Sequence, residues 1–566
     1  MFLSFLLNAV YCTVLSIDLG SEYYKMAQSS LSSEPQMVLN SNSVVPTSTA
    51  IAFRSSKNIS KPIDPESIFK YQIRFGNQAI PLLKKNSSLG FRYLNRLIGR
   101  ENKTEFYTSN LANVTELFAI SLHNLVGKHS YTDGISFVIP QFWTNEQRVA
   151  ISSACNIVDL PVLTIVDDFT AISLLYGSLR NNKYRKSPKH ILFVDVGSTS
   201  CKAYGAKFVW KKDSTSVYQT SAFWSEKCGG YYLSKLLSQS KNLSFKKASK
   251  LLQHSDTKEF LPYINDVLEE LKRIISDAML LSNKTSGPFD EVQVTGGASQ
   301  YKFIVDTILS TTMLPKIQRD FNANEAYALG GVIAGLQSSD ISIYSPVHVN
   351  RLPMFTINVT CGNATENYCI KNDKCTDYIV LNSTGCKTVQ LLSPQEEVPE
   401  GTINLVAEYE LVNISNFSPL EDQQSQGILS MTSPDALVDK IIWCANQSEA
   451  NCYPIDNHPY FRHKKEQELS KLWASTYIEI LKSKQRKAKL LEKVDSQLKL
   501  LKQMILPKEG APPNVNVFSV GEPYKDVFME RLEEYNSGKM HNWDEGEVLG
   551  AQEDLEEIMK NLVKQM

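Results

Sequence analysis

Hydrophobic and polar positions follow two periods along the first part of the chain, from about residue 14 to residue 337. Short runs rich in β-branched residues, typical of buried strands, alternate with stretches whose apolar residues recur at helical spacing. This alternation predicts an α/β domain. The expected strands are 14–18, 134–139, 190–196 and 292–294, and the expected helices are 146–158, 170–179 and 304–311.

The pattern changes twice after that domain. A polar break at 338–345 predicts a linker. Residues 346–460 alternate Val, Thr and Asn with frequent turn signals, which predicts a small β-sandwich-like domain. Residues 461–566 carry apolar residues at helical spacing among dense Lys and Glu, which predicts a helical domain. Its expected helices are 466–505, 525–535 and 550–563.

The first residues are apolar but too few to cross a bilayer. The run from Phe2 to Tyr11 is well short of the roughly 20 residues that a spanning helix needs. We expect residues 1–12 to be a signal peptide cut near Cys12, and residues 13–337 to form the α/β domain. A leader strand or an uncleaved anchor is the alternative, because no basic residue precedes the apolar run.

Cysteines and potential glycosylation sites both indicate an oxidising compartment. Six cysteines crowd into one region, and such a cluster in a secreted chain is typical of disulfides, whose connectivity the sequence leaves open. A zinc site is the alternative, although the cluster has no C-x-x-C pair and no histidine. The clustered cysteines are Cys361, Cys369, Cys375, Cys386, Cys444 and Cys452, and the sequons begin at Asn58, Asn86, Asn102, Asn113, Asn242, Asn283, Asn358, Asn363, Asn382, Asn413, Asn416 and Asn446.

The charge of the chain argues against some classes of partner. Lys and Arg number 59 and Asp and Glu number 60, so the formal net charge is −1. That balance provides no electrostatic footprint for nucleic acid or for an anionic membrane. We therefore expect small molecules and proteins as partners, with no nucleic acid, and no membrane once the signal peptide is removed.

Two segments have the form strand, aspartate, glycine, hydroxyl residue. The first is Asp18-Leu19-Gly20-Ser21 and the second is Asp195-Val196-Gly197-Ser198. A glycine lets backbone N–H groups approach a phosphate closely, and an aspartate can hold a hydrated Mg²⁺. A third turn, Gly296-Gly297-Ala298, leads into a helical pattern whose N-terminus could meet an anion or a nucleoside. Three such turns predict two similar lobes that face one nucleotide.

The order of these turns resembles the actin, sugar-kinase and heat-shock protein 70 superfamily, and within it the heat-shock chaperones. Four further segments carry the resemblance, which covers roughly residues 14–336. The pair Ser21-Glu22 and the residue Asp168 resemble the large endoplasmic-reticulum branch, the hypoxia up-regulated or glucose-regulated proteins. The four segments are L-I-G-R at 97–100, V-I-P-Q-F at 138–142, V-D-D-F-T-A at 166–171 and F-N-A-N-E-A at 321–326.

The resemblance implies a fold and a nucleotide site. The fold is an actin-like two-lobed ATPase domain, followed by the small β-sandwich-like domain and the α-helical domain. The cofactors are ATP or ADP with Mg²⁺, the metal held through water by Asp18 and Asp195. The nucleotide-binding residues, including a glycine pair that resembles the family's hinge, are Asp18, Gly20, Ser21, Glu22, Tyr23, Asp195, Gly197, Ser198, Thr199, Gly229, Gly230, Gly296, Gly297, Ala298 and Gln300.

Three departures from the family pattern bear on hydrolysis. Asn95 stands where the family has a lysine that orients the attacking water or the γ-phosphate, and Asp168 stands where it has a catalytic glutamate. Gln300 replaces an arginine that meets the adenine. Asp168 and Asp195 remain the candidate catalytic residues. Because binding needs the turns while hydrolysis also needs a positioned water, we expect nucleotide binding with slow or absent turnover.

Two segments are candidates for the basic helix that contacts adenine in this family. One is 245–252, with Lys246, Lys247 and Lys250, and the other is 268–276, with Lys272 and Arg273. The sequence does not choose between them.

The implied function is that of an ATP-binding chaperone of the endoplasmic reticulum lumen. Such a protein holds unfolded client polypeptides and accelerates nucleotide exchange on the lumenal binding protein, its smaller relative. The alternatives are a pseudo-ATPase scaffold without a functional nucleotide cleft and a foldase that hydrolyses ATP by itself. A sugar kinase of the same fold would have no use for the helical C-terminal part.

Overall fold

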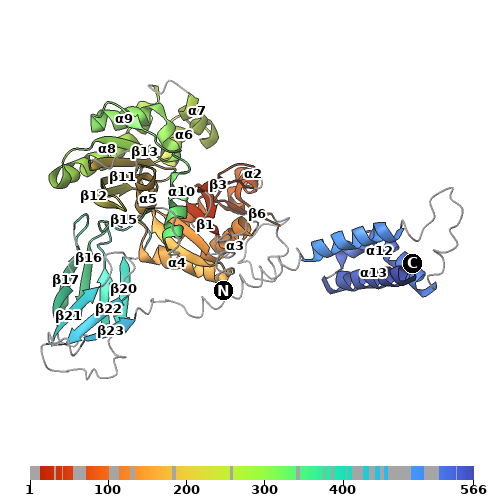
Figure 1. The fold of residues 1–566 in the computed structure, drawn as a ribbon. Coiled ribbons are helices and arrows are strands. Elements are labelled where there is room, and N and C mark those ends of the chain that lie inside the picture. The colour runs from red at the N-terminus through yellow and green to blue at the C-terminus, as the bar shows by residue number, and fades with distance from the viewer. Residues whose placement is uncertain are drawn as a thin grey trace. The chain divides into compact units, whose positions relative to one another are not determined.

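The computed structural model divides into two compact units, Met1–Ser470 and Lys471–Met566 (Figure 1). The signal peptide expected at 1–12 lies outside the described residues. The structure describes residues 13–30, 34–40, 43–54, 72–100, 114–127, 134–180, 187–254, 259–338, 345–373, 375, 378–383, 388–402, 404–410, 425–431, 440–445, 452–456, 486–502, 522–543 and 545–565.

The first unit begins with a six-stranded sheet in the order β3-β2-β1-β8-β9, with β4 paired to β2. Its central strand β1 (Thr13–Leu19) runs antiparallel to β2 (Tyr23–Ser30) and parallel to β8 (Gly134–Ile139). Every residue of β8 is buried, as expected for a β-branched run covered on both faces. The remaining strands are β3 (Gln36–Val38), β4 (Thr47–Ser48) and β9 (Val162–Asp167).

A second six-stranded sheet repeats this plan in the order β14-β13-β10-β11-β12-β15. Its strand β10 (Lys189–Val196) runs antiparallel to β11 (Cys201–Trp210) and parallel to β13 (Glu291–Thr295). The repeated plan brings the aspartate of each D-x-G-S segment to the end of an equivalent strand. The other strands are β12 (Thr215–Ser225), β14 (Ile317–Gln318) and β15 (Val347–Asn350).

Strand β15 lies beyond the linker expected at 338–345. It pairs in parallel with β12, so that Thr215 lies opposite Val347 and Tyr218 opposite Asn350. The second sheet therefore takes its last strand from residues that the sequence analysis placed in the β-rich region.

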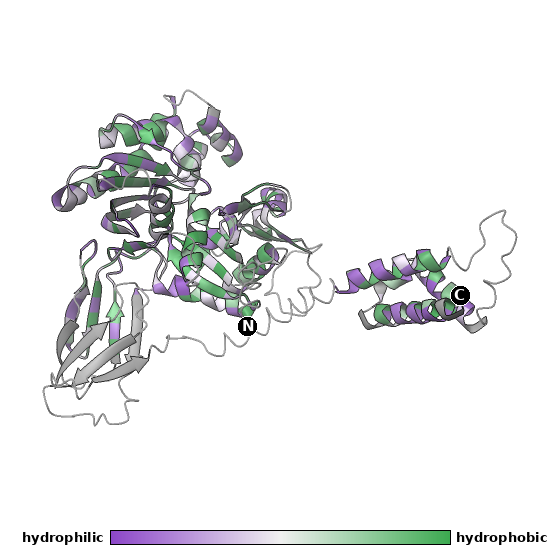
Figure 2. Cartoon of the chain, viewed as in Figure 1, coloured by the Kyte–Doolittle hydropathy of each residue, from purple (hydrophilic) through white to green (hydrophobic). Residues whose placement is uncertain are grey.

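Helices bury the apolar faces of both sheets. Helix α10 (Ala326–Ser338) packs against β1 and α5 (Asp168–Arg180), and hydrophobic residues run along it (Figure 2). Helix α8 (Leu261–Ser286) packs on β11 and β12 (Figure 1). The other helices of these lobes are α2 (Ile80–Lys85), α3 (Val114–Val126), α4 (Asn145–Ile157), α6 (Gly230–Ser240), α7 (Phe245–His254) and α9 (Lys302–Thr312).

Short elements complete the two lobes. A three-stranded sheet consists of β5 (Ile51–Arg54), β6 (Gln72–Phe75) and β7 (Gly90–Phe91). The 3-10 helices are η2 (Gly76–Gln78), η3 (Ser87–Leu89), η4 (Leu94–Leu97) and η6 (Gly297–Gln300).

The rest of the described first unit is β-rich, as the sequence predicted. Two antiparallel sheets have the orders β17-β16-β19-β20 and β18-β21-β22-β23. That they form a substrate- or partner-binding domain spanning 346–460 stays a prediction. The strands are β16 (Ile357–Cys361), β17 (Ala364–Cys369), β18 (Tyr378–Ser383), β19 (Thr388–Leu392), β20 (Leu405–Glu410), β21 (Ser425–Met431), β22 (Lys440–Ala445) and β23 (Cys452–Asp456).

The described part of the second unit is helical, as expected. Residues 486–502 form a helix, followed by α12 (Glu522–Asn536), the 3-10 helix η9 (Lys539–Asn542) and α13 (Glu545–Gln565). The first of these helices supplies Val494, Leu498 and Leu501 to an apolar core that the other two complete. No helix of the described ranges is long and apolar enough to cross a membrane.

Disulfides occur both inside and outside the cysteine-rich region that the sequence predicted. Cys201 and Cys228 form a disulfide, although both lie far from the cysteine-rich region. Within that region Cys369 pairs with Cys375, and Cys361 is also disulfide-bonded. Cys155 is free and buried. The described residues contain no cluster of side chains fit to hold a metal ion.

Candidate functional site

A cleft with a volume of about 380 Å³ lies between the two lobes. The three glycine turns converge on it, so the structure brings together residues that are far apart in the sequence. Gly229 precedes α6 and does not line the cleft, although its neighbour Gly230 does. The sequence-predicted residues that line it are Asp18, Gly20, Ser21, Glu22, Tyr23, Asp168, Asp195, Gly197, Ser198, Thr199, Gly230, Gly296, Gly297, Ala298 and Gln300.

The first turn connects β1 to β2. Asp18 lies directly opposite Lys25 in the antiparallel pair, and Lys25 Nζ donates a hydrogen bond to Asp18 Oδ2 over 2.7 Å. The Thr49 hydroxyl donates to the Ser21 carbonyl over 2.7 Å. The register of the hairpin thus places an ammonium group beside the acid of the turn, since opposite residues of an antiparallel pair share one face.

The second turn connects β10 to β11 in the same way. Asp195 lies directly opposite Lys202, and Lys202 Nζ donates to Asp195 Oδ2 over 2.6 Å. The same ammonium donates to Asp168 Oδ2, also over 2.6 Å. Lys202 therefore bridges the two residues that the sequence analysis named as candidate catalytic acids.

This bridge is buried, because the side chains of Lys202, Asp168 and Asp195 are 8%, 3% and 5% exposed. Burial alone lowers the pKa of Lys202, but the adjacent Asp168 and Asp195 carboxylates outweigh that effect and hold the pKa above its usual value. Lys202 is consequently a permanent cation in the cleft.

Asp168 has few free lone pairs. The backbone N–H groups of Gln141 and Phe169 donate to its Oδ1 over 3.0 and 2.9 Å, and the Tyr204 hydroxyl donates to the same oxygen over 3.1 Å. The other oxygen accepts from Lys202. Burial raises the pKa of the Asp168 carboxyl, although Lys202 beside it acts in the opposite direction. A carboxyl group held by four donors is poorly placed to orient a water molecule.

Asn95 does not take the role of the family's lysine. It is fully buried in η4 and its Nδ2 donates to the Gly20 carbonyl over 2.9 Å. Asn95 therefore stabilises the backbone of the first turn, and it does not line the cleft.

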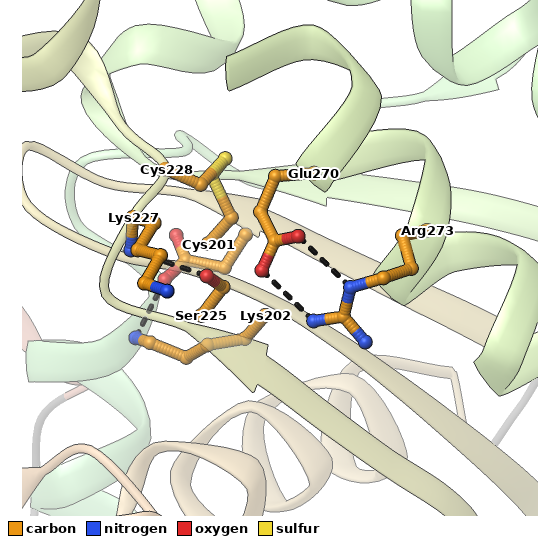
Figure 3. Close-up of a disulfide and its surroundings, with 8 residues drawn as sticks. Cys201, Lys202, Ser225, Lys227, Cys228, Glu270 and Arg273 are labelled. Atoms are coloured by element: carbon orange, nitrogen blue, oxygen red, sulfur yellow. Dashed lines mark hydrogen bonds and ion pairs between the residues drawn. A yellow bond between two sulfur atoms is a disulfide. The ribbon is translucent and has the colours of Figure 1, made fainter. Parts of the chain in front are cut away.

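A disulfide supports the second turn instead. Cys201 begins β11 directly after the turn, and Cys228 lies just before α6 (Figure 3). The backbone N–H groups of Gly230 and Tyr231 donate to the carbonyls of Gly197 and Ser198 over 3.0 and 2.7 Å. The first turn of α6 thus fixes the Gly197-Ser198 turn with N–H groups that a helix N-terminus otherwise leaves unpaired.

Side chains from the two lobes meet across the cleft. The rings of Tyr93 and Tyr231 lie 5.2 Å apart in an edge-to-face arrangement. Arg96 donates to the Tyr232 hydroxyl over 3.0 Å, and Phe142 stacks on Trp224 at 4.3 Å. These contacts define a closed arrangement of the lobes around the cleft.

Of the two candidate adenine-contacting helices, only α7 contributes residues to the cleft. Phe245, Ser249 and Gln253 of α7 line the cleft, whereas no residue of 268–276 does so. The lysines that made α7 a candidate are exposed and do not line the cleft. They are Lys246, Lys247 and Lys250. Lys272 and Arg273 of the other candidate pair with acids of their own helix α8. The face of α7 toward the cleft is therefore uncharged.

Asp167, the buried neighbour of Asp168, pairs with an arginine that follows β15. Arg351 forms an ion pair with Asp167, which is fully buried. Burial raises the pKa of Asp167, but Arg351 and Arg148 outweigh it and hold the pKa below its usual value. Asp167 is therefore ionised and its neighbour Asp168 is held in position.

Sequence reasoning missed several residues of the cleft. The most consequential is Lys202, and the signal for it was present, because D-x-G-S is followed by lysine seven residues after the aspartate in both turns. The aromatic residues had no comparable motif. The cleft residues not foreseen include Lys25, Tyr93, Arg96, Lys202, Tyr231, Tyr301 and Tyr327.

Comparisons with known proteins agree with the motifs. Residues 126–204, which contain β8 to the start of β11, match the family model described as Hsp70 protein. Hypoxia up-regulated protein 1 of Xenopus tropicalis is 24% identical over 63% of this chain and 66% of its own length. The protein of the same name from Danio rerio is 21% identical over 62% of this chain and 43% of its own length.

A fungal relative is similar at the same level. Heat shock protein 70 homolog lhs1 of Schizosaccharomyces pombe is 21% identical over 72% of this chain and 56% of its own length. The chain thus spans less than two thirds of each of these three relatives. The chain is similar to the heat-shock protein 70 superfamily and to its hypoxia up-regulated branch, as the sequence motifs predicted.

Proposed function

We propose that this protein is a nucleotide-binding chaperone of the endoplasmic reticulum lumen, which holds unfolded polypeptides and promotes nucleotide exchange on a smaller heat-shock 70 relative, the lumenal binding protein. The observation that carries the proposal is the convergence of three glycine turns on one cleft between two lobes of the same plan. A cleft of about 380 Å³ falls in the range of small-molecule sites. Similarity to heat-shock 70 relatives supports the chaperone role.

The bound ligand would be ATP or ADP. Gly20, Gly197 and Gly297 lie where backbone N–H groups can approach phosphates, and Ala298, Gln300 and the uncharged face of α7 would enclose the nucleoside. The sequence predicted a magnesium ion at Asp18 and Asp195, but in the structure each of these carboxylates already pairs with a lysine.

Hydrolysis would be slow or absent. The position of the family's lysine holds the buried Asn95, and the candidate catalytic Asp168 is engaged by four donors. Stabilising the charge that develops on a transferred phosphoryl group requires donors aimed at that group. The structure therefore supports binding more than chemistry, and it disfavours a foldase that hydrolyses ATP by itself.

The lumenal location is proposed from several features together. The two disulfides Cys201–Cys228 and Cys369–Cys375 suit an oxidising compartment. Among the sequons within the described residues, Asn86, Asn242, Asn283 and Asn363 are exposed and open to glycosylation. The signal peptide remains part of this proposal.

The first experiment measures ADP and ATP binding by calorimetry on the full chain. We expect micromolar binding by the wild type and its loss in Gly297→Leu. A Cβ at Gly297 would lie 3.5 Å from Asn324 Oδ1, an ordinary contact, so the backbone accepts a side chain at this position of the cleft. The matched control is Gly550→Leu in α13, where a Cβ would meet nothing within 4 Å. A wild type that binds no nucleotide would instead favour the pseudo-ATPase scaffold.

A second experiment tests the chaperone role. The purified chain should suppress aggregation of an unfolded client and accelerate release of labelled ADP from the smaller lumenal relative. If it did neither, the proposal of a chaperone and exchange factor would be wrong, whatever the outcome of the nucleotide titration.

A further inference from the structure

A lysine occupies the point between the two candidate catalytic acids. Lys202 Nζ lies 2.6 Å from Asp168 Oδ2 and 2.6 Å from Asp195 Oδ2, in a bridge whose three side chains are all less than one tenth exposed. A buried ion pair persists only where each charge is compensated and hydrogen-bonded. Lys202 satisfies both conditions, and the Tyr327 ring lies 5.6 Å from the ammonium.

A divalent cation does not fit these residues. Mg²⁺ needs about six oxygen ligands at about 2.0–2.1 Å in a nearly octahedral shell. One carboxylate oxygen of each of Asp18, Asp168 and Asp195 is already bound to an ammonium group. A metal in this place would lie against Lys202 and be repelled by it, because like charges in a poorly solvated site interact strongly.

We propose that Lys202 is the resident cation of the cleft and replaces the divalent ion, so that a nucleoside diphosphate or triphosphate binds here equally well with and without Mg²⁺. The inference rests on the nucleotide binding proposed above. An ammonium has three N–H donors, and two of those of Lys202 are directed to Asp168 and Asp195. The third is left for a phosphate oxygen, since Lys202 lines the cleft.

The charge balance of the cleft supports this assignment. Asp18, Asp168 and Asp195 would repel a polyphosphate, and the metal that normally accompanies a nucleotide offsets such repulsion. Here Lys25 and Lys202 offset it from within the chain. Because these ammonium groups are covalently attached, they are present before the nucleotide arrives and do not depend on the magnesium concentration.

The test compares ADP affinity in magnesium and in EDTA, measured by calorimetry on the full chain. For the wild type we expect the two dissociation constants to agree within about twofold. In Lys202→Met, which removes the charge at similar length, the affinity in EDTA should fall by at least about tenfold and be recovered in part by Mg²⁺. The control is Lys207→Met, a lysine of the same strand β11 that does not line the cleft, and it should behave like the wild type.

The outcomes separate this inference from the proposed function. A wild type that binds ADP tightly in magnesium and at least about tenfold more weakly in EDTA would overturn the role of Lys202 while leaving nucleotide binding intact. A wild type that binds no nucleotide in either buffer would overturn both. The wild-type comparison decides the question by itself, so a folding defect in Lys202→Met, detected as a lower unfolding temperature, would not obscure the result.

Discussion

The two phosphate turns share a plan and differ in how they are supported. In both, an aspartate at the end of a strand lies opposite a lysine of the next strand. Lys25 pairs with one acid, and its side chain is 17% exposed, whereas Lys202 is 8% exposed and pairs with two acids. The first turn is supported by hydrogen bonds from Asn95 and Thr49, the second by a disulfide and the start of α6.

This difference shows how one duplicated plan can give two kinds of site. The first turn keeps the properties of a binding loop, because its supports act on backbone carbonyls and leave the acid with a single partner. The second turn combines a covalent support with a buried ammonium group that two acids share. We therefore expect loss of the lysine or the disulfide of the second turn to lower stability more than loss of the lysine of the first turn.

The largest effect should come from Lys202, and the equivalent lysine of the first turn gives the comparison. Lys202→Met leaves two buried carboxylates without a counterion and should lower the free energy of unfolding by about 3–5 kcal/mol. Lys25→Met leaves one acid with some access to water and should cost roughly 1.5 kcal/mol. Urea unfolding followed by tryptophan fluorescence measures both. Equal losses in the two variants would contradict the comparison.

The disulfide of the second turn should have the next largest effect. It closes a loop of 27 residues, and replacing both Cys201 and Cys228 by alanine should lower the free energy of unfolding by about 3–4 kcal/mol. The reductant dependence of thermal unfolding is the more specific measurement. Cys155→Ala, which removes the free buried cysteine, should leave that dependence unchanged.

For the glycines of the two turns we expect the opposite order, with the larger loss of stability in the first turn. A Cβ on Gly20 would lie 2.7 Å from the Tyr23 carbonyl oxygen, whereas a Cβ on Gly197 would lie 3.2 Å from that of Ser200. We expect Gly20→Ala to cost about 1–3 kcal/mol and Gly197→Ala less than about 1 kcal/mol. Thermal unfolding of the two variants side by side tests this order, and a larger loss in Gly197→Ala would reverse it.

The smallest effect should be that of Asn95→Ala. The substitution removes the donor to the Gly20 carbonyl and should cost about 1 kcal/mol. It should also weaken ADP binding, because the first turn loses its support. An unchanged affinity, measured by the same calorimetric titration, would show that the turn keeps its shape without Asn95.

The α/β core could be predicted because its strands are continuous apolar runs. Expected strands 134–139 and 190–196 correspond to β8 (Gly134–Ile139) and β10 (Lys189–Val196). A strand that is buried on both faces is apolar along its whole length, so the run can be recognised in the sequence without knowing its neighbours. The glycine turns at their ends followed from the same reasoning, and these turns are the part of the cleft that the sequence located.

Side chains that reach the cleft from other strands and helices were harder to predict. Lys202 becomes a partner of Asp195 only through the register of the hairpin, and Cys228 returns to Cys201 only because β11 and β12 fold back on each other. The lysines of α7 made it a candidate to contact the nucleoside, and α7 does line the cleft, but with other residues. Phe245, Ser249 and Gln253 recur every four residues on the face toward the cleft, and Lys246, Lys247 and Lys250 lie on other faces.

Strand β15 has a consequence for where the lobes can be separated from the rest of the chain. A fragment ending at residue 345, in the polar break, would lose β15 and expose the edge of β12. An unpaired edge strand readily pairs with other chains, so such a fragment should self-associate. It would also lose Arg351 and leave Asp167 with a weaker set of counterions beside Asp168. A fragment that ends after Leu352 retains both the strand and the arginine.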